Sequence, residues 1–330
     1  MILVDGSAVS MPDTPENQAA YPQPSIQKPG RGFPVARVVV LIALATGAVL
    51  DAAIGRCSGK LTGESTLLRG LHGRLRRDDI VLADRYYCSY FEVALLKAQG
   101  VDLVTRQNVG RTVDFRRGRR LGKDDHLVEW TRPQRASWMD KEEYAMIPAT
   151  LTVRELRVRV GQRGFRTRVL TVVTTLLDAG SFSHAELAGL YRARWRVELD
   201  LRSIKLTLKM DVLRCKTPEM VRKELWGHLL ISNLIRGVMA ESARRPGVLP
   251  RRLSFQGARQ MLEGFRVELN GASPEAIGGL IEVLLRMVSR LRVGDRPDRY
   301  EPRERKRRAK AYPLMHLPRH LSKKLMAKAG

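Results

Sequence analysis

The first eleven residues, MILVDGSAVSM (residues 1–11), are the stretch on which the fold prediction depends. A short run of aliphatic and β-branched residues that ends in Asp-Gly is typical of a β-strand. The pattern predicts a strand at the beginning of the chain, with Asp5 at the end of the strand. Asp5 is therefore the first candidate for a site residue.

The next hundred residues alternate between strand and helix patterns. The predicted elements are, in order, strands at residues 35–47 and 48–57, a helix at 63–79, a strand at 80–89, a helix at 90–100 and a strand at 101–106. This order, followed by a long helix, is that of an RNase H-like core, an α/β fold with a mixed five-stranded sheet flanked by helices. In such a core the ends of the first and fourth strands are neighbours, so Asp5 and Asp84 are expected to lie together.

The pattern changes after the fifth predicted strand. Residues 111–180 contain segments in which apolar and basic residues alternate with period two, which predicts a β-rich insertion with a basic face before the last catalytic helix. We assign residues 1–110 to the first part of the core, residues 181–245 to the catalytic helix and a packing helix that complete it, and residues 246–330 to C-terminal helices and a basic tail.

The composition favours a partner that is a polyanion. The formal net charge is +25 and the pI is near 10.7, so nucleic acid is the expected partner. The longest apolar run, residues 38–50, is too short to span a membrane, and no secretory signal is visible, which predicts a cytoplasmic protein with no membrane partner. Three cysteines without a CxxC spacing and scattered histidines argue against a disulfide framework or a Cys/His metal site.

One acid stands among many arginines in YRARWRVELDLRSIK (residues 191–205). A solvated helix face of mixed charge is the ordinary explanation of such a pattern. At about 100° per residue, however, four side chains of this stretch fall within roughly 60° of one another on a helix. They are Tyr191, Arg194, Glu198 and Lys205. One helix face thus presents an acid together with two cations and a hydroxyl group.

Three carboxylates would suit a hard divalent cation. Glu198 on the helix could join Asp5 and Asp84 to make an oxygen-ligand site for Mg²⁺ or Mn²⁺. Two such ions activate a water or a 3′-OH group and stabilise the leaving oxygen during phosphodiester cleavage.

With these residues in place, the chain resembles the catalytic part of IS4-family (DDE) insertion-sequence transposases. The family signature is Tyr, two residues, Arg, three residues, Glu, six residues and Lys, and residues 191–205 fill every position. LVDGSAVSMPDTPENQAAYPQP (residues 3–24) resembles the first-aspartate segment of the family, and IVLADRYYCSY (residues 80–90) resembles the second.

The resemblance implies an enzyme that cleaves DNA at the ends of an insertion sequence and joins the freed 3′-OH to target DNA, with two Mg²⁺ or Mn²⁺ ions. The implied catalytic and metal-binding residues are Asp5, Asp84 and Glu198. The residues implied to contact transposon-end DNA are Tyr191, Arg194 and Lys205. The implied partners are double-stranded DNA and, in the DNA complex, a second copy of the chain. Because family members usually carry an N-terminal DNA-binding region before the first catalytic strand, we expect the chain to be an N-terminally truncated member.

Two other functions fit parts of the pattern: an RNase H-like nuclease without strand transfer, and a non-catalytic DNA-binding remnant of a transposase. Asp13 and Asp51 compete with Asp5 as the first acid, but Asp13 lies in a proline-rich loop that favours a turn, and Asp51 lies within a predicted strand. GRCSGKL (residues 55–61) resembles a phosphate-binding loop but has the wrong glycine spacing and Leu61 at the Ser/Thr position, so no nucleotide cofactor is expected.

Three tryptophans raise the question of base stacking. In related transposases a tryptophan of the insertion stacks on a flipped base, and the insertion here contains Trp130 and Trp138, although residues 168–175, just upstream of the final helix, contain none. Trp195, beside the signature, is expected in the core, because large aromatic side chains on helices usually pack.

Overall fold

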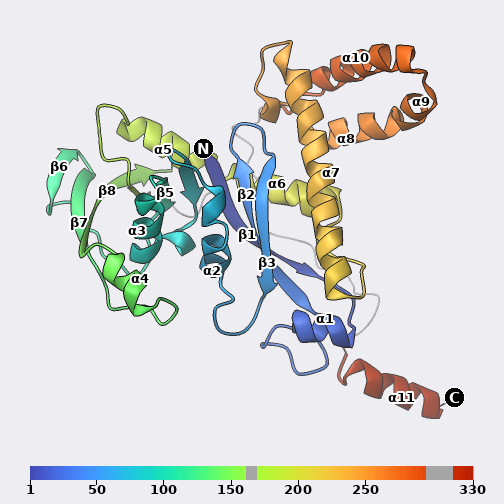
Figure 1. Ribbon diagram of the computed structural model, residues 1–330, viewed down its shortest axis with the longest axis horizontal. Coiled ribbons are helices and arrows are strands. Elements are labelled where there is room, and N and C mark those ends of the chain that lie inside the picture. The colour runs from blue at the N-terminus through green and yellow to red at the C-terminus, as the bar shows by residue number, and fades with distance from the viewer. Residues whose placement is uncertain (161–168, 295–314, 330) are drawn as a thin grey trace.

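A nine-stranded mixed sheet forms the centre of the molecule (Figure 1). In the computed structural model, which describes residues 1–160, 169–294 and 315–329, the strand order is β3-β2-β1-β4-β5-β9-β8-β7-β6. The strands are β1 (Ile2–Ser10), β2 (Val35–Ala43), β3 (Val49–Arg56), β4 (Ile80–Ala83), β5 (Asp102–Arg106), β6 (Arg119–Gly122), β7 (Asp125–Thr131), β8 (Thr150–Arg159) and β9 (Val169–Thr174).

The first five strands have the topology of an RNase H-like core. β2 pairs antiparallel with both β1 and β3, whereas β4 pairs parallel with both β1 and β5. The predicted mixed five-stranded sheet is therefore confirmed. The expectation that Asp5 ends its strand was wrong, because β2 is long enough to keep pairing with β1 through Ser10, and this long-range ladder overrides the local Asp-Gly signal.

The strands of the insertion extend this sheet. β9 pairs antiparallel with β5, and β8, β7 and β6 follow in antiparallel order. The turn expected near residues 161–164 and most of the basic tail, residues 295–314, lie outside the described residues. The division of the chain at residues 110, 180 and 245 stays a prediction.

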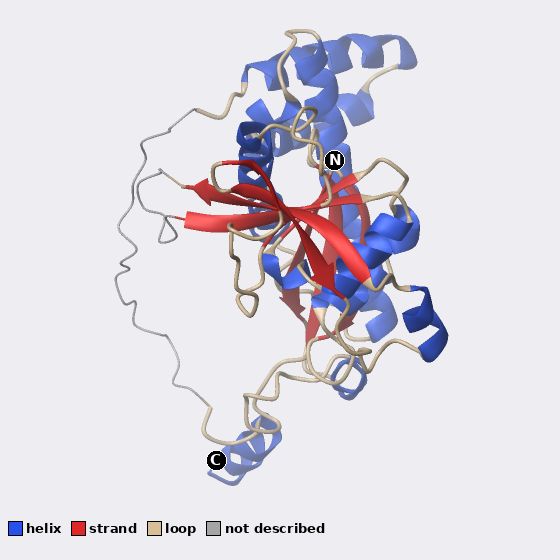
Figure 2. Ribbon diagram, turned by 90° about the vertical axis from the view of Figure 1, so that its left-hand side faces the viewer, coloured by secondary structure: helices blue, strands red, loops and turns tan. Residues whose placement is uncertain are grey.

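Helices cover both faces of the sheet, as Figure 2 shows. They are α1 (Pro15–Ala20), α2 (Glu64–Arg69), α3 (Tyr90–Ala98), α4 (Lys141–Met146), α5 (His184–Ala193), α6 (Arg196–Arg202), α7 (Pro218–Arg244), α8 (Phe255–Gly264), α9 (Arg266–Gly271), α10 (Pro274–Arg290) and α11 (Arg319–Ala329). Four shorter helical turns are η1 (His72–Arg74), η2 (Arg85–Tyr87), η3 (Ser203–Thr207) and η4 (Pro250–Arg252). No described helix is long and apolar enough to cross a membrane.

Two cores form because side chains alternate across β1 and β2. On one face, Leu3 and Val40 share a core with Leu201 of α6 and Leu225 of α7. On the opposite face, residues such as Val4 join a second core that includes side chains from α2 and α3. A third core joins the C-terminal half of α7 to α8 and α10, which places the C-terminal helices at one end of α7 (Figure 1).

A buried ion cluster around Asp200 ties these parts together. The Asp200 side chain on α6 is 2% exposed. Its carboxylate accepts a bond from Arg236 of α7 (2.7 Å) and two from Arg251 of η4 (3.0 and 2.8 Å). Arg251 also donates to the carbonyls of Ala43, the last residue of β2, and of Leu44, which follows it. The cluster therefore fixes α6 against the sheet and the C-terminal helices at the same time.

We expect Asp200→Ala to lower the free energy of unfolding by about 3–5 kcal/mol, because it leaves two buried guanidinium groups without their carboxylate. Urea denaturation of the full chain measures this loss. Glu219→Ala, which removes the exposed pair with Lys223, is the matched control and should leave stability nearly unchanged. A loss from Asp200→Ala no larger than that of the control contradicts the clamp.

Candidate active site

The pairing of β1 with β4 brings two of the predicted acids together. The parallel ladder ends at the pair Leu3 and Leu82, and Asp5 and Asp84 each lie two residues beyond that pair. Side chains two residues apart in a strand point to the same face, and neighbouring strands are about 4.8 Å apart. Leu3 and Leu82 both face the core that includes α6. Asp5 and Asp84 are therefore positioned side by side toward α6.

Local hydrogen bonds orient both carboxylates. Asp5 Oδ1 accepts from the backbone N–H of Gly6 (2.8 Å), and Asp84 Oδ1 accepts from the N–H of Arg85 (2.6 Å), where it caps η2. The hydroxyl of Thr105 on β5 donates to the Asp84 carbonyl (2.9 Å). The strand that pairs with β4 on its other side therefore also fixes the backbone at Asp84.

The signature stretch is not the single regular helix that its sequence predicts. α5 ends at Ala193, α6 begins at Arg196, and the π-helical turn η3 follows directly. Across the junction, four N–H groups donate to the carbonyl three residues back instead of four; they belong to Arg194, Trp195, Val197 and Glu198. With this tight turn and the wider π turn, Tyr191 on one side and Ile204 on the other are both buried against the sheet, which favours the irregular path.

Arg194 lies among the three predicted acids. Its Nη2 is 3.2 Å from Glu198 Oε1, and its side chain is only 11% exposed. Burial acts against the charged guanidinium, yet the pKa of Arg194 is raised, because Tyr191, Asp84, Asp5 and Glu198 are all close enough to stabilise the cation. Asp5, Asp84 and Glu198 thus converge on one cation, although they come from three distant parts of the chain.

The environment of Asp5 is strongly unfavourable for a charge. Burial is the main reason that the pKa of Asp5 is raised from 3.8 to about 6, and the charges of Glu64 and Glu198 raise it further. The Gly6 hydrogen bond and the charge of Arg194 act in the opposite direction. Sequence reasoning missed Glu64, since the acid opens a short helix far from every motif and only the fold places it near Asp5.

The remaining signature residues divide between the core and β1. Tyr191 is 7% exposed, and burial raises the pKa of its hydroxyl. Lys205 Nζ donates to Ser7 Oγ and to the Ala8 carbonyl, both at 3.0 Å. Tyr191, Arg194 and Glu198 therefore form one group beside the acids, whereas Lys205 contacts β1 a few residues beyond Asp5.

The acids suit a divalent cation by their chemistry. Among the residues that the structure describes, no three His, Cys, Asp or Glu side chains already stand close enough to hold a metal ion. Carboxylate oxygens are nevertheless the ligands that Mg²⁺ and Mn²⁺ prefer. Burial is the main cause of the raised pKa of Asp5, and repulsion from Glu64 and Glu198 makes a smaller contribution. A bound cation relieves that repulsion, so Asp5, Asp84 and Glu198 fit such an ion.

One tryptophan does not lie where the sequence predicts it. Trp195, expected in the core, is 47% exposed, because Tyr191 and Val197 take the buried positions around the tight turn. Trp130 is 2% exposed, donates its N–H to Glu155 (2.9 Å) and has the Arg111 guanidinium 4.1 Å from its ring. The ring of Trp138 is likewise covered by an arginine, Arg69, at 3.7 Å. Each of the two insertion tryptophans therefore already has an arginine over its ring, where a flipped base would stack.

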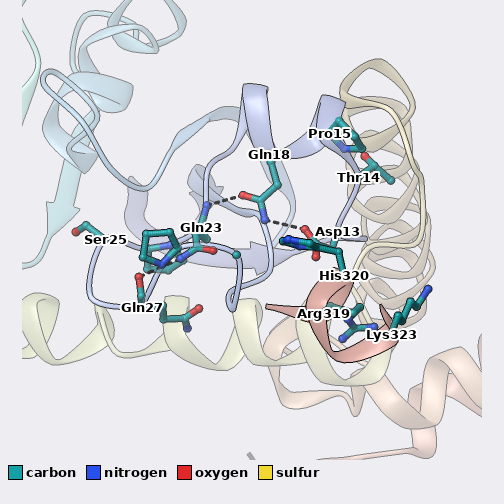
Figure 3. Close-up of a pocket in the computed structure, with 13 residues that line it drawn as sticks. Asp13, Thr14, Pro15, Gln18, Gln23, Ser25, Gln27, Arg319, His320 and Lys323 are labelled. Carbon is teal, nitrogen blue, oxygen red and sulfur yellow. Dashed lines mark hydrogen bonds between the residues drawn. The ribbon is translucent and has the colours of Figure 1, made fainter. Parts of the chain in front are cut away.

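A pocket of about 720 Å³ lies elsewhere, between the loop after β1 and helix α11 (Figure 3). Its polar lining includes Asp13, Gln18, Arg319, His320 and Lys323, and it shares no residue with the acid cluster. Asp13, the alternative first acid, here accepts a hydrogen bond from Gln18 (2.8 Å). The other alternative, Asp51, is paired with Arg74.

A sheet with RNase H-like topology, with Asp5 in β1, Asp84 after the neighbouring β4 and Glu198 on α6, is typical of the class of DDE nucleic-acid enzymes. The family described as "Transposase DDE domain" matches residues 1–234. The transposase InsG for insertion sequence element IS4 of Escherichia coli (strain K12) is 31% identical over 320 residues, which are 95% of this chain and 69% of InsG. The chain belongs to the IS4 family of DDE transposases.

Other similarities cover less or are more distant. The putative transposase InsL for insertion sequence element IS186A of Escherichia coli (strain K12) is 32% identical over 75 residues, 23% of this chain and 20% of InsL. A piggyBac transposase in a synaptic complex with hairpin DNA aligns with a TM-score of 0.47 and 8% identity over 91% of this chain, which spans 60% of that protein.

We expect Asp5→Asn to stabilise the metal-free protein. Because the folded-state pKa of about 6 lies above the ordinary value, ionised Asp5 lowers stability; the penalty is complete above pH 6 and absent below about pH 4. At pH 7.5 in EDTA, the substitution should raise the free energy of unfolding by about 3 kcal/mol, because each pKa unit corresponds to about 1.4 kcal/mol. Urea denaturation at pH 7.5, 6 and 4 measures the gain, with Asp13→Asn as control. A gain that is absent, or that persists at pH 4, contradicts the crowding of Asp5.

Proposed function

We propose that the chain cleaves phosphodiester bonds at insertion-sequence ends and joins the freed 3′-OH to target DNA, using Asp5, Asp84 and Glu198. The observation that carries the proposal is the convergence of these acids around Arg194 in a member of the IS4 family. The three carboxylates are the residues that would hold two Mg²⁺ or Mn²⁺ ions. When bound, such ions activate the attacking hydroxyl and stabilise the leaving oxygen.

The cations of the signature are proposed to hold DNA. Without a metal ion, the positive charge of Arg194 offsets the negative charge of the acids. When metal ions neutralise the acids, the guanidinium can bind a phosphate at the cleaved end. Lys205 lies along β1 on the same side as the acids and can bind a neighbouring phosphate. Tyr191 is buried against Arg194, so its proposed contribution to DNA binding is made through Arg194, the side chain that its ring supports.

The surface near the acids is suited to double-stranded DNA. Arg85 next to Asp84, and Arg202 one helical turn after Glu198, are exposed, as is Arg192 in the last turn of α5. Together with a net charge of +25, these side chains supply the phosphate contacts that dominate DNA affinity. We propose that the partners are transposon ends and target DNA, that two copies of the chain act in the DNA complex, and that the protein works in the cytoplasm.

We predict that Asp5→Ala, Asp84→Ala and Glu198→Ala each slow Mg²⁺-dependent cleavage by more than about a hundredfold. The substrate is duplex DNA that carries the element's ends. Non-specific DNA binding should persist, because each acid supplies negative charge for the metal and makes no favourable phosphate contact. Asp13→Ala and Asp51→Ala are matched controls and should keep wild-type cleavage. Full activity in any triad variant contradicts the assignment of that residue.

The products of the same reaction separate the rival functions. A labelled 3′-OH end joined to a second duplex is the result expected of a transposase. Metal-dependent nicking without joined product supports a nuclease without strand transfer. DNA binding without either product supports a non-catalytic remnant.

A further inference from the structure

Glu64, the first residue of α2, is an acid outside the signature whose carboxylate lies against β1. At Gly6, an added Cβ would lie 2.3 Å from Glu64 Cδ and 2.5 Å from Glu64 Oε1. The Glu64 carboxylate therefore occupies the space that any side chain at this position would need. Gly6 directly follows Asp5, and its N–H already holds the Asp5 carboxylate at 2.8 Å. Two carboxylates thus flank one glycine: that of Glu64 occupies its side-chain position on the α2 face of β1, and that of Asp5 accepts its N–H.

A second contact connects Glu64 with the segment after β4. The hydroxyl of Tyr87, a residue that is 1% exposed, donates to Glu64 Oε2 at 3.2 Å. Tyr87 ends η2, the turn that Asp84 caps. Glu64 therefore lies against the residue that follows Asp5 within β1 and accepts a hydrogen bond from the turn that follows β4.

We infer that Glu64 is a fourth carboxylate of the acid cluster, and that it binds, directly or through a water, the divalent ion held by Asp5. This inference rests on the proposed function, because that function supplies the ion. Three observations carry it: the closeness of Glu64 to the Asp5–Gly6 backbone, the glycine that makes room for it, and the buried tyrosine that holds its second oxygen. A carboxylate placed beside like charge without a cation is unfavourable, whereas a shared cation makes the arrangement favourable.

Mn²⁺ binding to the full chain, measured by calorimetry and by the electron paramagnetic resonance of free Mn²⁺, tests the inference without an activity assay. Glu64→Gln keeps the shape and the hydrogen-bonding capacity of the side chain but removes its charge. We expect it to weaken Mn²⁺ binding by about tenfold or more. Tyr87→Phe removes only the hydrogen bond to Glu64 and should change the affinity by less than about twofold. If Glu64 merely supports the fold through Tyr87, the two variants should behave alike, and that result overturns the inference.

Gly6→Ala provides a second variant. The added methyl group should displace the Glu64 carboxylate and weaken Mn²⁺ binding, with little further loss when it is combined with Glu64→Gln, because both changes remove the same interaction. Fully additive losses would overturn the inference. Thermal unfolding in EDTA establishes that each variant is folded.

Asp5→Asn distinguishes failure of this inference from failure of the proposed function. If Asp5→Asn abolishes Mn²⁺ binding while Glu64→Gln binds as the wild type does, the acid site stands and the role of Glu64 is overturned. If Asp5→Asn and the wild type bind Mn²⁺ equally, the proposed site itself is wrong, and the inference fails with it.

Discussion

The register in which β1 pairs with β4 is the constraint on which the site depends. The ladder ends at Leu3 and Leu82, and Asp5 and Asp84 each lie two residues beyond that pair, so the register of the pair sets which face they point to. A shift of one strand by a single residue would turn its aspartate to the opposite face of the sheet. Because the pairing is short, β2 and β5 must fix it from outside, and β2 does so by pairing with β1 along its whole length.

The second requirement is that each acid is paired with a cation. Helix α6 carries two such acids, one buried and one partly exposed. Glu198 and Asp200 are two residues apart and so point to nearly opposite sides of the helix. Asp200 is buried between Arg236 and Arg251 and fixes the helix, whereas Glu198 is 38% exposed and pairs with Arg194. One acidic residue thus serves the fold on one face of α6 and another serves the candidate chemistry on the opposite face, because the two faces differ in solvent access.

The sequence predicts those features that depend on local patterns. Alternating strand and helix patterns predicted the order of the core, and acids at the ends of predicted strands pointed to Asp5 and Asp84, although β1 continues beyond Asp5. Features that depend on distant contacts were missed: the joining of β9 to β5, the tight turn at Arg194, the exposure of Trp195, and Glu64 against Gly6. Helical spacing placed Tyr191, Arg194 and Glu198 together correctly, since the irregular turns at the junction and at η3 leave both flanks packed on the sheet.

The central claim is that acids from β1, β4 and α6 form one divalent-metal site. Its most direct test is metal-directed cleavage, in which Fe²⁺ replaces Mg²⁺ and, with ascorbate and peroxide, cuts the backbone near the bound ion. Mass spectrometry of the fragments locates the cuts. We predict cuts near Asp5, Asp84 and Glu198, all suppressed by excess Mg²⁺. Cuts confined to other segments, or cuts that Mg²⁺ does not suppress, would contradict the account.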